Sequence, residues 1–182
     1  MAAKKINDDS LPDGYGRGAA PPAPPGTLLY YLGLGSNLGD RAGLLDKAVA
    51  ALESLGKVTR SRWYETAAVG LPGAPPFLNA VVRLETDLAA DELLWQTREI
   101  ERQLGRDPLR RAGSRTIDID ILLYGRQVIS RPGLVIPHPR LHQRAFVLVP
   151  LAELAPDLVH PVLGKTVTEM LAEVGSAGVK AA

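Results

Sequence analysis

Two aspartates, Asp118 and Asp120, stand two residues apart in a stretch whose residue types and alternation predict a β-strand. Side chains two apart in a strand share a face, so both carboxylates point the same way. The opposite face carries Ile117, Ile119 and Ile121. Neighbouring carboxylates repel, and burying one without a cation is costly, whereas Mg2+ takes one or two carboxylates and completes its shell with water and phosphate. The stretch supports two interpretations: a metal–polyphosphate site, or a solvated strand face held by salt bridges.

An arginine-rich segment leads into this strand. Residues 98–115 contain six arginines and three acids: Arg98, Arg102, Arg106, Arg110, Arg111 and Arg115 against Glu99, Glu101 and Asp107. The planar guanidinium suits phosphate oxygens, although most arginine runs are only solvated surface. Because this run continues directly into the two-aspartate strand, through a loop of residues 107–114 that is able to move, we favour a phosphate site.

Composition limits the other function classes. The chain has 182 residues, enough for one domain with a sound core, and its 46% hydrophobic and 23% charged content is typical of a soluble globular protein. A net charge of +1 argues against nucleic acid or a membrane surface as partner. The absence of cysteine excludes disulfides, zinc–thiolate sites and cysteine nucleophiles, and fits a cytoplasmic protein. The sequence has neither a bilayer-spanning apolar run nor the apolar core of a signal peptide.

Residues 1–26 differ from the rest of the chain in composition. They contain scattered glycines and the cluster Pro21-Pro22-Ala23-Pro24-Pro25-Gly26, with little to bury. We expect a disordered Pro/Gly-rich tail rather than a proline-rich docking motif, which is the alternative. One folded domain is expected to occupy residues 27–182.

The periodicity within that domain predicts an alternation of strands and helices. We expect strands at 28–34, 58–65, 77–86 and 113–124. We expect helices from Asn37 to Gly56 and at 90–104, 144–154 and 163–174, and frayed final residues. The last helix shows a capping-box pattern at Thr166 and Glu169. The glycine-rich stretch 33–40 is neither a Walker loop nor a dinucleotide fingerprint; it predicts a strand–turn–helix junction, with Asn37 as the helix N-cap.

Two further polar residues admit a structural and a functional interpretation. Asn79, at the start of a strand beside a glycine- and proline-rich loop, is either a turn residue or a reader of the edge of a flat polar ligand. His138 lies between two prolines and is either structural or, with Arg140 and Arg144 nearby, a phosphate ligand.

In their order and spacing, these segments resemble the 6-hydroxymethyl-7,8-dihydropterin pyrophosphokinase family. The resemblance runs from Leu28 to about Val174. It rests on Gly33–Asp40, Tyr64-Glu65-Thr66, Phe77-Leu78-Asn79-Ala80, Ile100-Glu101 with Gly105-Arg106, Arg115–Asp120, Pro137-His138-Pro139-Arg140 and Arg144-Ala145-Phe146. The Arg-Thr-Ile-Asp-Ile-Asp segment is the most specific of these.

The resemblance implies a pyrophosphokinase domain over residues 27–182, a monomer acting on ATP and a reduced pterin. Pyrophosphate would pass from ATP to the hydroxymethyl oxygen of the pterin, giving AMP and the pterin diphosphate. The resemblance assigns two Mg2+ ions to Asp118 and Asp120, catalysis to Arg106 and Arg115, the nucleotide to Glu101, His138 and Arg144, and the pterin to Thr66, Phe77, Asn79 and Phe146. It further implies an α+β fold, a ferredoxin-like sandwich with a mostly antiparallel sheet and helices on both faces.

The chain departs from the family pattern in its loops. Ala112-Gly113-Ser114 stands where many members have Trp-Gly-Pro, and Thr66-Ala67-Ala68 replaces Thr-Pro-Pro. We therefore expect a looser lid and weaker pterin affinity. Two rivals are a binding module without turnover, which would not need two metals, and an RNA-binding sheet, which would need exposed aromatics that an aromatic content of 5% disfavours.

Overall fold

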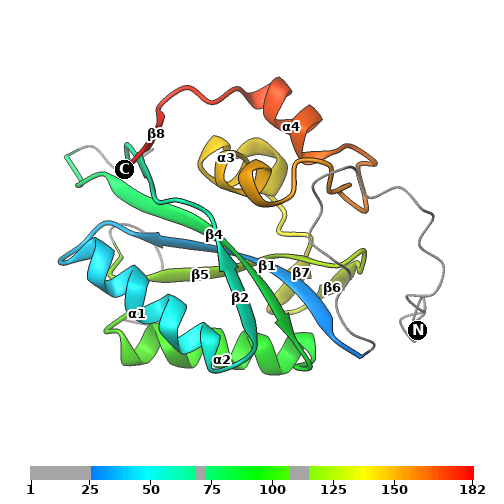
Figure 1. The fold of residues 1–182 in the computed structure, drawn as a ribbon, viewed down its shortest axis with the longest axis horizontal. Helices are drawn as coiled ribbons and strands as arrows, with labels where there is room; N and C mark the ends of the chain where they lie inside the picture. Colours follow the sequence, from blue (N-terminus) through cyan, green and yellow to red (C-terminus); the bar gives the residue numbers. More distant parts are fainter. Residues whose placement is uncertain (1–25, 69–72, 107–114) are drawn as a thin grey trace.

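An antiparallel six-stranded sheet forms the centre of the molecule (Figure 1). The computed structural model describes residues 26–68, 73–106 and 115–182. The strand order is β5-β1-β4-β3-β8, and β2 also pairs with β4. The strands are β1 Leu28–Ser36, β2 Lys57–Arg60, β3 Tyr64–Thr66, β4 Phe77–Thr86, β5 Asp118–Tyr124 and β8 Val179–Ala181. Two short strands, β6 Ile129–Arg131 and β7 Leu134–Ile136, form a separate hairpin.

Four α-helices in the described residues cover the sheet. They are α1 Arg41–Glu53, α2 Ala90–Gln103, α3 Ala145–Leu154 and α4 Val167–Val174, and a 3-10 turn, η2 Leu141–Gln143, precedes α3. Figure 1 shows α1 and α2 on one face of the sheet and α3 and α4 on the other. None of these helices is long and apolar enough to cross a bilayer. The predicted antiparallel sheet with interspersed helices is confirmed.

Strand β1 lies between β4 and β5 and separates two hydrophobic cores. Tyr30, Leu32 and Leu34 pack with α1 and α2, and Tyr31 packs with α3 and α4. The face of β1 that carries Tyr31 continues with Gly33 and Gly35, since side chains alternate along a strand. The sheet surface beneath α3 therefore has side chains at one end of β1 and bare backbone at the other.

The register of the sheet aligns one residue from each of three neighbouring strands at Gly35. Gly35 is the cross-strand partner of Asn79 on β4 and of Asp118 on β5. Gly33 is likewise the partner of Asp120. Partners in a sheet project to the same side, so the aspartates and Asn79 share one face of the sheet.

Three sequence-based predictions of local structure are wrong. The expected strand 58–65 is two strands, because the Ser61 hydroxyl accepts the Val81 N–H at 3.0 Å between β2 and β3. The N-cap of α1 is Asp40, whose carboxylate accepts from Gly43 N, and not Asn37. The final residues form β8, which pairs with β3, instead of fraying.

The two C-terminal helices follow the predictions more closely. Helix α3 is one continuous helix with Pro150 inside it. Helix α4 begins at Val167, later than the predicted residue 163, and its capping box of Thr166 and Glu169 is confirmed.

Candidate active site

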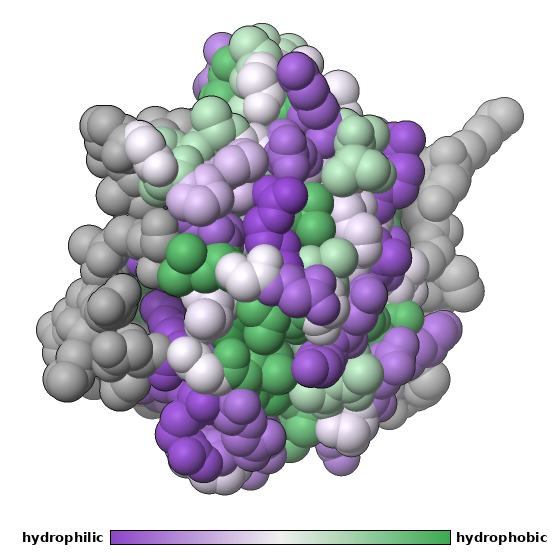
Figure 2. All heavy atoms as spheres, turned by 90° about the vertical axis from the view of Figure 1, so that its left-hand side faces the viewer, coloured by the Kyte–Doolittle hydropathy of each residue, from purple (hydrophilic) through white to green (hydrophobic). Residues whose placement is uncertain are grey.

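The two aspartates open strand β5 and stand on the face of the sheet that α3 covers. Ile117, Ile119 and Ile121 are buried in the opposite core with α1 and α2, which confirms the predicted alternation. Figure 2 views the molecule from the left of Figure 1, and hydrophobic side chains show between hydrophilic ones in the middle of this end. The burial of the isoleucines fixes the direction in which both carboxylates project.

Two arginines converge on Asp118. The Arg106 guanidinium lies 2.7 Å from Asp118 Oδ1, and the Arg115 guanidinium contacts Asp118 Oδ2. The Asp118 side chain is only 18% exposed, so the two cations are screened less than surface ions would be. The predicted catalytic arginines and the first predicted metal ligand therefore lie in one cluster.

Glu101 extends this cluster from the last turn of α2. Its carboxylate accepts the Ile119 N–H at 2.7 Å and forms an ion pair with Arg106. Strand β5 is an outer strand of the sheet, so Ile119 N has no neighbouring strand on that side to bond with. Burial raises the pKa of Glu101 to about 7, and the backbone N–H and Arg106 only partly offset this.

Asp120 and His138 lie on the other side of Asp118. Burial, then the charge of Asp118, raises the pKa of Asp120 to about 6. His138 Nε2 is 3.8 Å from Asp120 Oδ2, and His138 Nδ1 accepts from Arg140 N at 3.1 Å. Burial, then the charges of Arg144 and Arg140, lowers the pKa of His138 to about 4. His138 is therefore a neutral imidazole at pH 7, not a salt-bridge partner.

The predicted pterin residues form a second group. Asn79 Nδ2 donates to Thr66 Oγ1 at 2.9 Å, which leaves the amide oxygen of Asn79 to accept other donors. Phe77 precedes Asn79 by two residues and shares its face, and a Cβ on Gly35 would meet both side chains. Phe146, at the start of α3, lies under the Arg144 guanidinium, 5.4 Å from ring centroid to Cζ.

Gly35 leaves the space between the two groups without a side chain of its own strand, whereas the Leu122 side chain lies over Gly33. A Cβ on Gly35 would stand 3.1 Å from Asn79 Oδ1. Neighbouring strands lie about 4.8 Å apart, so Asp118 and Asn79 are separated by roughly 10 Å across a backbone without a side chain. We call the backbone at Gly35 the trough: carboxylates and cations lie on one side of it, and amide and aromatic groups lie on the other.

Asn37 was missed by sequence reasoning as a site residue. It is 1% exposed, its Oδ1 accepts from Arg115 N at 2.7 Å, and its Nδ2 donates to Pro75 O at 3.2 Å. Arg41 holds the same loop by donating to Pro76 O at 2.7 Å. Asn37 thus connects the segment before β5 to the segment before β4. The signal in the sequence was a polar residue directly after a buried strand, which we assigned to helix capping instead.

Some predictions fall outside the described residues. These are the loop 107–114, including Ala112 in place of the family's tryptophan, and nearly all of the tail 1–26.

The donor set suits Mg2+ better than a closed structural metal site. Two like-charged carboxylates face one way, and the charge of Asp118 helps to raise the pKa of Asp120. No cluster of three or more acids, histidines or cysteines in the described part of the chain could hold a metal alone. Mg2+ does not require one, because it completes its shell with water and phosphate.

Comparisons with known proteins give the family of this chain. Residues 31–156 match the model of the 7,8-dihydro-6-hydroxymethylpterin-pyrophosphokinase (HPPK) family. The 2-amino-4-hydroxy-6-hydroxymethyldihydropteridine pyrophosphokinase of Methylorubrum extorquens is 47% identical over 153 residues, covering 82% of this chain and 96% of that protein. The protein of the same name from Aquifex aeolicus is 41% identical over 144 residues, covering 79% and 90%.

A solved structure agrees on the fold. The crystal structure of Plasmodium falciparum HPPK-DHPS with pteroate matches with a TM-score of 0.66 at 18% identity, over 81% of this chain and 42% of that longer chain. The family match and the identities to curated relatives lead to one conclusion: the chain belongs to the HPPK family and is the diphosphotransferase that moves pyrophosphate from ATP to 6-hydroxymethyl-7,8-dihydropterin in folate biosynthesis.

Proposed function

We propose that this transfer takes place in the trough between Asp118 and Asn79, with two Mg2+ ions on Asp118 and Asp120. The observation that carries the proposal is the register, which sets Asp118, Gly35 and Asn79 level on three adjacent strands. A polyphosphate held at the aspartates and a flat ring held at Asn79 would meet over the bare backbone of Gly35. The products would be AMP and 6-hydroxymethyl-7,8-dihydropterin diphosphate.

ATP would bind on the β5 side. Mg2+ bound at the two carboxylates would neutralise phosphate charge and hold the chain bent for attack at the β-phosphorus. Arg106 and Arg115 stand on either side of Asp118. A guanidinium has five N–H donors, enough to contact a carboxylate and phosphate oxygens together. We assign these two arginines to stabilising the charge that develops on the transferred group.

The remaining nucleotide residues act through placement and charge. Neutral His138 offers one nitrogen as a hydrogen-bond donor beside Asp120, because its Nδ1 already accepts from Arg140 N. Arg144 adds a cation at the start of α3. Glu101 would hold Arg106 in position through their ion pair, and its carboxylate also accepts the Ile119 N–H of β5.

The pterin would bind on the β4 side. Its amide-like edge can pair with Asn79, and Thr66 orients that amide by accepting from it. Phe77 and Phe146 would pack on its ring faces. Attack by the hydroxymethyl oxygen then depends mainly on positioning, with AMP as the leaving group and with water kept out. No described residue is assigned as a general base.

We further propose that the four helices and antiparallel sheet form a ferredoxin-like sandwich, with two helices packed on each face. We also propose that the protein is a cytoplasmic monomer. Sedimentation at micromolar concentration checks the oligomeric state.

The direct test is to incubate the protein with MgATP and the reduced pterin and to analyse both products. We expect AMP and a pterin diphosphate in equal amounts. ADP as the product, or intact ATP, would overturn the proposal.

A second test measures metal and nucleotide binding through the melting temperature, without measuring activity. With Mg2+ and a non-hydrolysable ATP analogue, the melting temperature should rise for the wild-type chain and not for Asp118→Asn. Asp157→Asn, an exposed acid after α3, is the matched control and should respond like the wild type. An equal rise in all three proteins would remove Asp118 from the metal site.

A further inference from the structure

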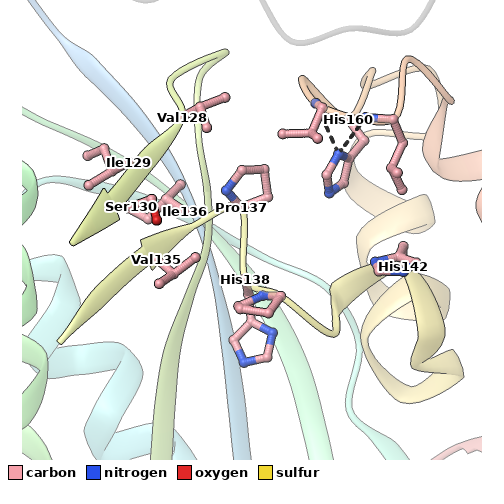
Figure 3. Close-up of a pocket in the computed structure, with 12 residues that line it drawn as sticks. Val128, Ile129, Ser130, Val135, Ile136, Pro137, His138, His142 and His160 are labelled. Carbon is pink, nitrogen blue, oxygen red and sulfur yellow. Dashed lines mark hydrogen bonds between the residues drawn. The ribbon is translucent and has the colours of Figure 1, made fainter. Parts of the chain in front are cut away.

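An apolar pocket lies apart from the trough, between the β6–β7 hairpin and the segment that follows α3. It encloses about 200 Å3, and Figure 3 shows the hairpin residues on one side and His142 and His160 on the other. Its rim is formed by Val128, Val135, Val162 and Leu163. Only His138 belongs both to this pocket and to the candidate active site.

The rim is unusually hydrophobic for a surface. Seven large hydrophobic side chains are exposed in the described residues, and four of them line this pocket: Val128 at 55%, Val135 at 44%, Val162 at 62% and Leu163 at 42%. Single exposed hydrophobic residues are ordinary, but a cluster around a hollow indicates a binding surface. We therefore expect another segment or molecule to bind in this pocket.

The walls of the pocket are held in place before anything binds. Val135 is the one outward residue of β7, between buried Leu134 and Ile136. His160 Nδ1 accepts from both Val162 N at 3.3 Å and Leu163 N at 3.2 Å, as the dashed lines in Figure 3 show. These bonds fix the turn that presents Val162 and Leu163. A preformed wall lowers the ordering cost of binding.

The start of the folded domain lies at the same corner of the molecule. Gly125 N donates to Leu29 O at 2.8 Å, which ties the beginning of β1 to the turn that leads into Val128. The 25 residues before Gly26 are outside the described part, and the chain enters β1 one residue before Leu29, the residue that this hydrogen bond ties to Gly125. Residues 21–25, with four prolines, would span roughly 15 Å as a polyproline II segment at about 3.1 Å per residue.

We propose that the proline-rich segment 21–25 of the same chain docks in this pocket. A polyproline segment is already extended and loses little entropy on binding, and its rings suit an apolar groove. The tether to β1 also gives the segment a high effective concentration at the pocket. The tail then covers the largest group of exposed hydrophobic side chains in the described residues, and it is not the plain tail that composition alone favours.

Disulfide trapping in the full chain tests this directly, because the natural sequence has no cysteine. One variant carries Ala23→Cys with Val162→Cys, and the matched control carries Ala23→Cys with Trp95→Cys. Val162 and Trp95 are both 62% exposed, but Trp95 lies on α2, against the opposite face of the sheet. Both proteins are oxidised in a glutathione buffer, and intrachain and interchain products are separated by mass spectrometry.

Docking predicts that the Ala23–Val162 disulfide forms within one chain about tenfold faster than the Ala23–Trp95 disulfide. Replacing the four prolines by serine in the first variant should remove most of that advantage. Equal rates for the two pairs would overturn the proposal. A disulfide that forms only between chains and slows on dilution would also overturn it, since the occupant would then be a second copy. Leu163→Cys replaces Val162→Cys as the partner if the latter variant does not fold.

Discussion

The sheet face beneath α3 carries a pair of charged side chains at each end, and the two pairs have opposite characters. Asp118 and Asp120 stand two apart on β5, and Arg83 and Glu85 stand two apart on β4. Arg83 Nη2 lies 2.9 Å from Glu85 Oε1, with the side chains 10% and 7% exposed. The two charges are opposite and pair with each other, and the exposed Lys57 is a further contact of Glu85, at 3.8 Å. The aspartates instead repel each other and are neutralised by cations from outside the pair.

The central strand differs between the two ends in the same way. β1 places Tyr31 opposite Arg83, and it places Gly33 and Gly35 opposite the aspartates. One end is therefore filled and self-neutralised, and the other is open and takes its positive charge from Arg106 and Arg115, which lie outside the pair. Both pairs have the same spacing, so spacing alone does not distinguish a structural pair from a functional site. The sign of the charges and the size of the residue on the neighbouring strand distinguish them.

The largest expected effect is on catalysis at the open end. Asp118→Asn or Asp120→Asn should lower AMP release by about 10³-fold, because each removes a charge placed for the metal and phosphate. The chain should stay folded, since asparagine keeps the size of the side chain and one oxygen that accepts hydrogen bonds. Glu85→Gln should keep the wild-type rate per folded molecule, and a near-normal rate in both aspartate variants would erase the distinction between the ends.

The closed end should instead govern stability. Glu85→Leu leaves Arg83 buried without its partner and should lower the free energy of unfolding by about 3 kcal/mol. Arg83→Met combined with Glu85→Leu should recover most of that loss, because an apolar pair needs no counter-charge. Urea denaturation measures both. A double variant as unstable as Glu85→Leu would show that the pair has a further role.

The open backbone between the two substrate groups gives a third prediction. Gly35→Ala should lower kcat/KM for the pterin by about 30-fold, because the new Cβ stands 3.1 Å from Asn79 Oδ1 and narrows the trough. Gly33→Ala is the control, since its Cβ would press on the Leu122 side chain at 3.3 Å and not on Asn79, and a smaller change in kcat/KM is expected. Steady-state kinetics compares the two, and equal losses would mean that the trough is not where the substrates meet.

The smallest effect concerns Asn37, which holds both sides of the open end. Asn37→Ala removes the hydrogen bonds to Arg115 N and Pro75 O and should reduce kcat about tenfold while raising KM for the pterin. Asn37→Asp keeps the acceptor for Arg115 N and loses the donor to Pro75 O. Asn37→Asp should therefore have a kcat close to that of the wild type, while its KM for the pterin stays raised. Identical kcat and KM values for Asn37→Ala and Asn37→Asp would contradict the separate roles of the acceptor and the donor.

The sheet at the site could be predicted because its strands have strong local patterns. β4 occupies the predicted residues 77–86, and the alternation through Asp118 and Asp120 is as expected. The family resemblance assigns Arg106, Arg115, Glu101 and Asp118 to one site, and in the structure these side chains lie together. Their roles toward ATP and pterin stay predictions.

The features that could not be predicted from the sequence depend on contacts between segments that are distant in the chain. Asn37 and Asp40 are equally suited to cap a helix, and what separates them is Arg115 N, 78 residues away, which donates to Asn37. β8 consists of residues without a strong pattern and exists because β3 offers an edge. The Arg83–Glu85 pair drew no attention in the sequence, because its burial depends on packing over the sheet and not on its neighbours in the chain.

The bond from Ile119 N to Glu101 has a consequence for solubility. An outer strand with an unsatisfied backbone donor and an apolar run such as Ile121–Leu123 is a template on which another chain can add a strand. Glu101 occupies that donor and places a carboxylate beside it. The residue that braces Arg106 therefore also guards the molecule against aggregation, so selection for soluble expression and selection for activity act on the same side chain.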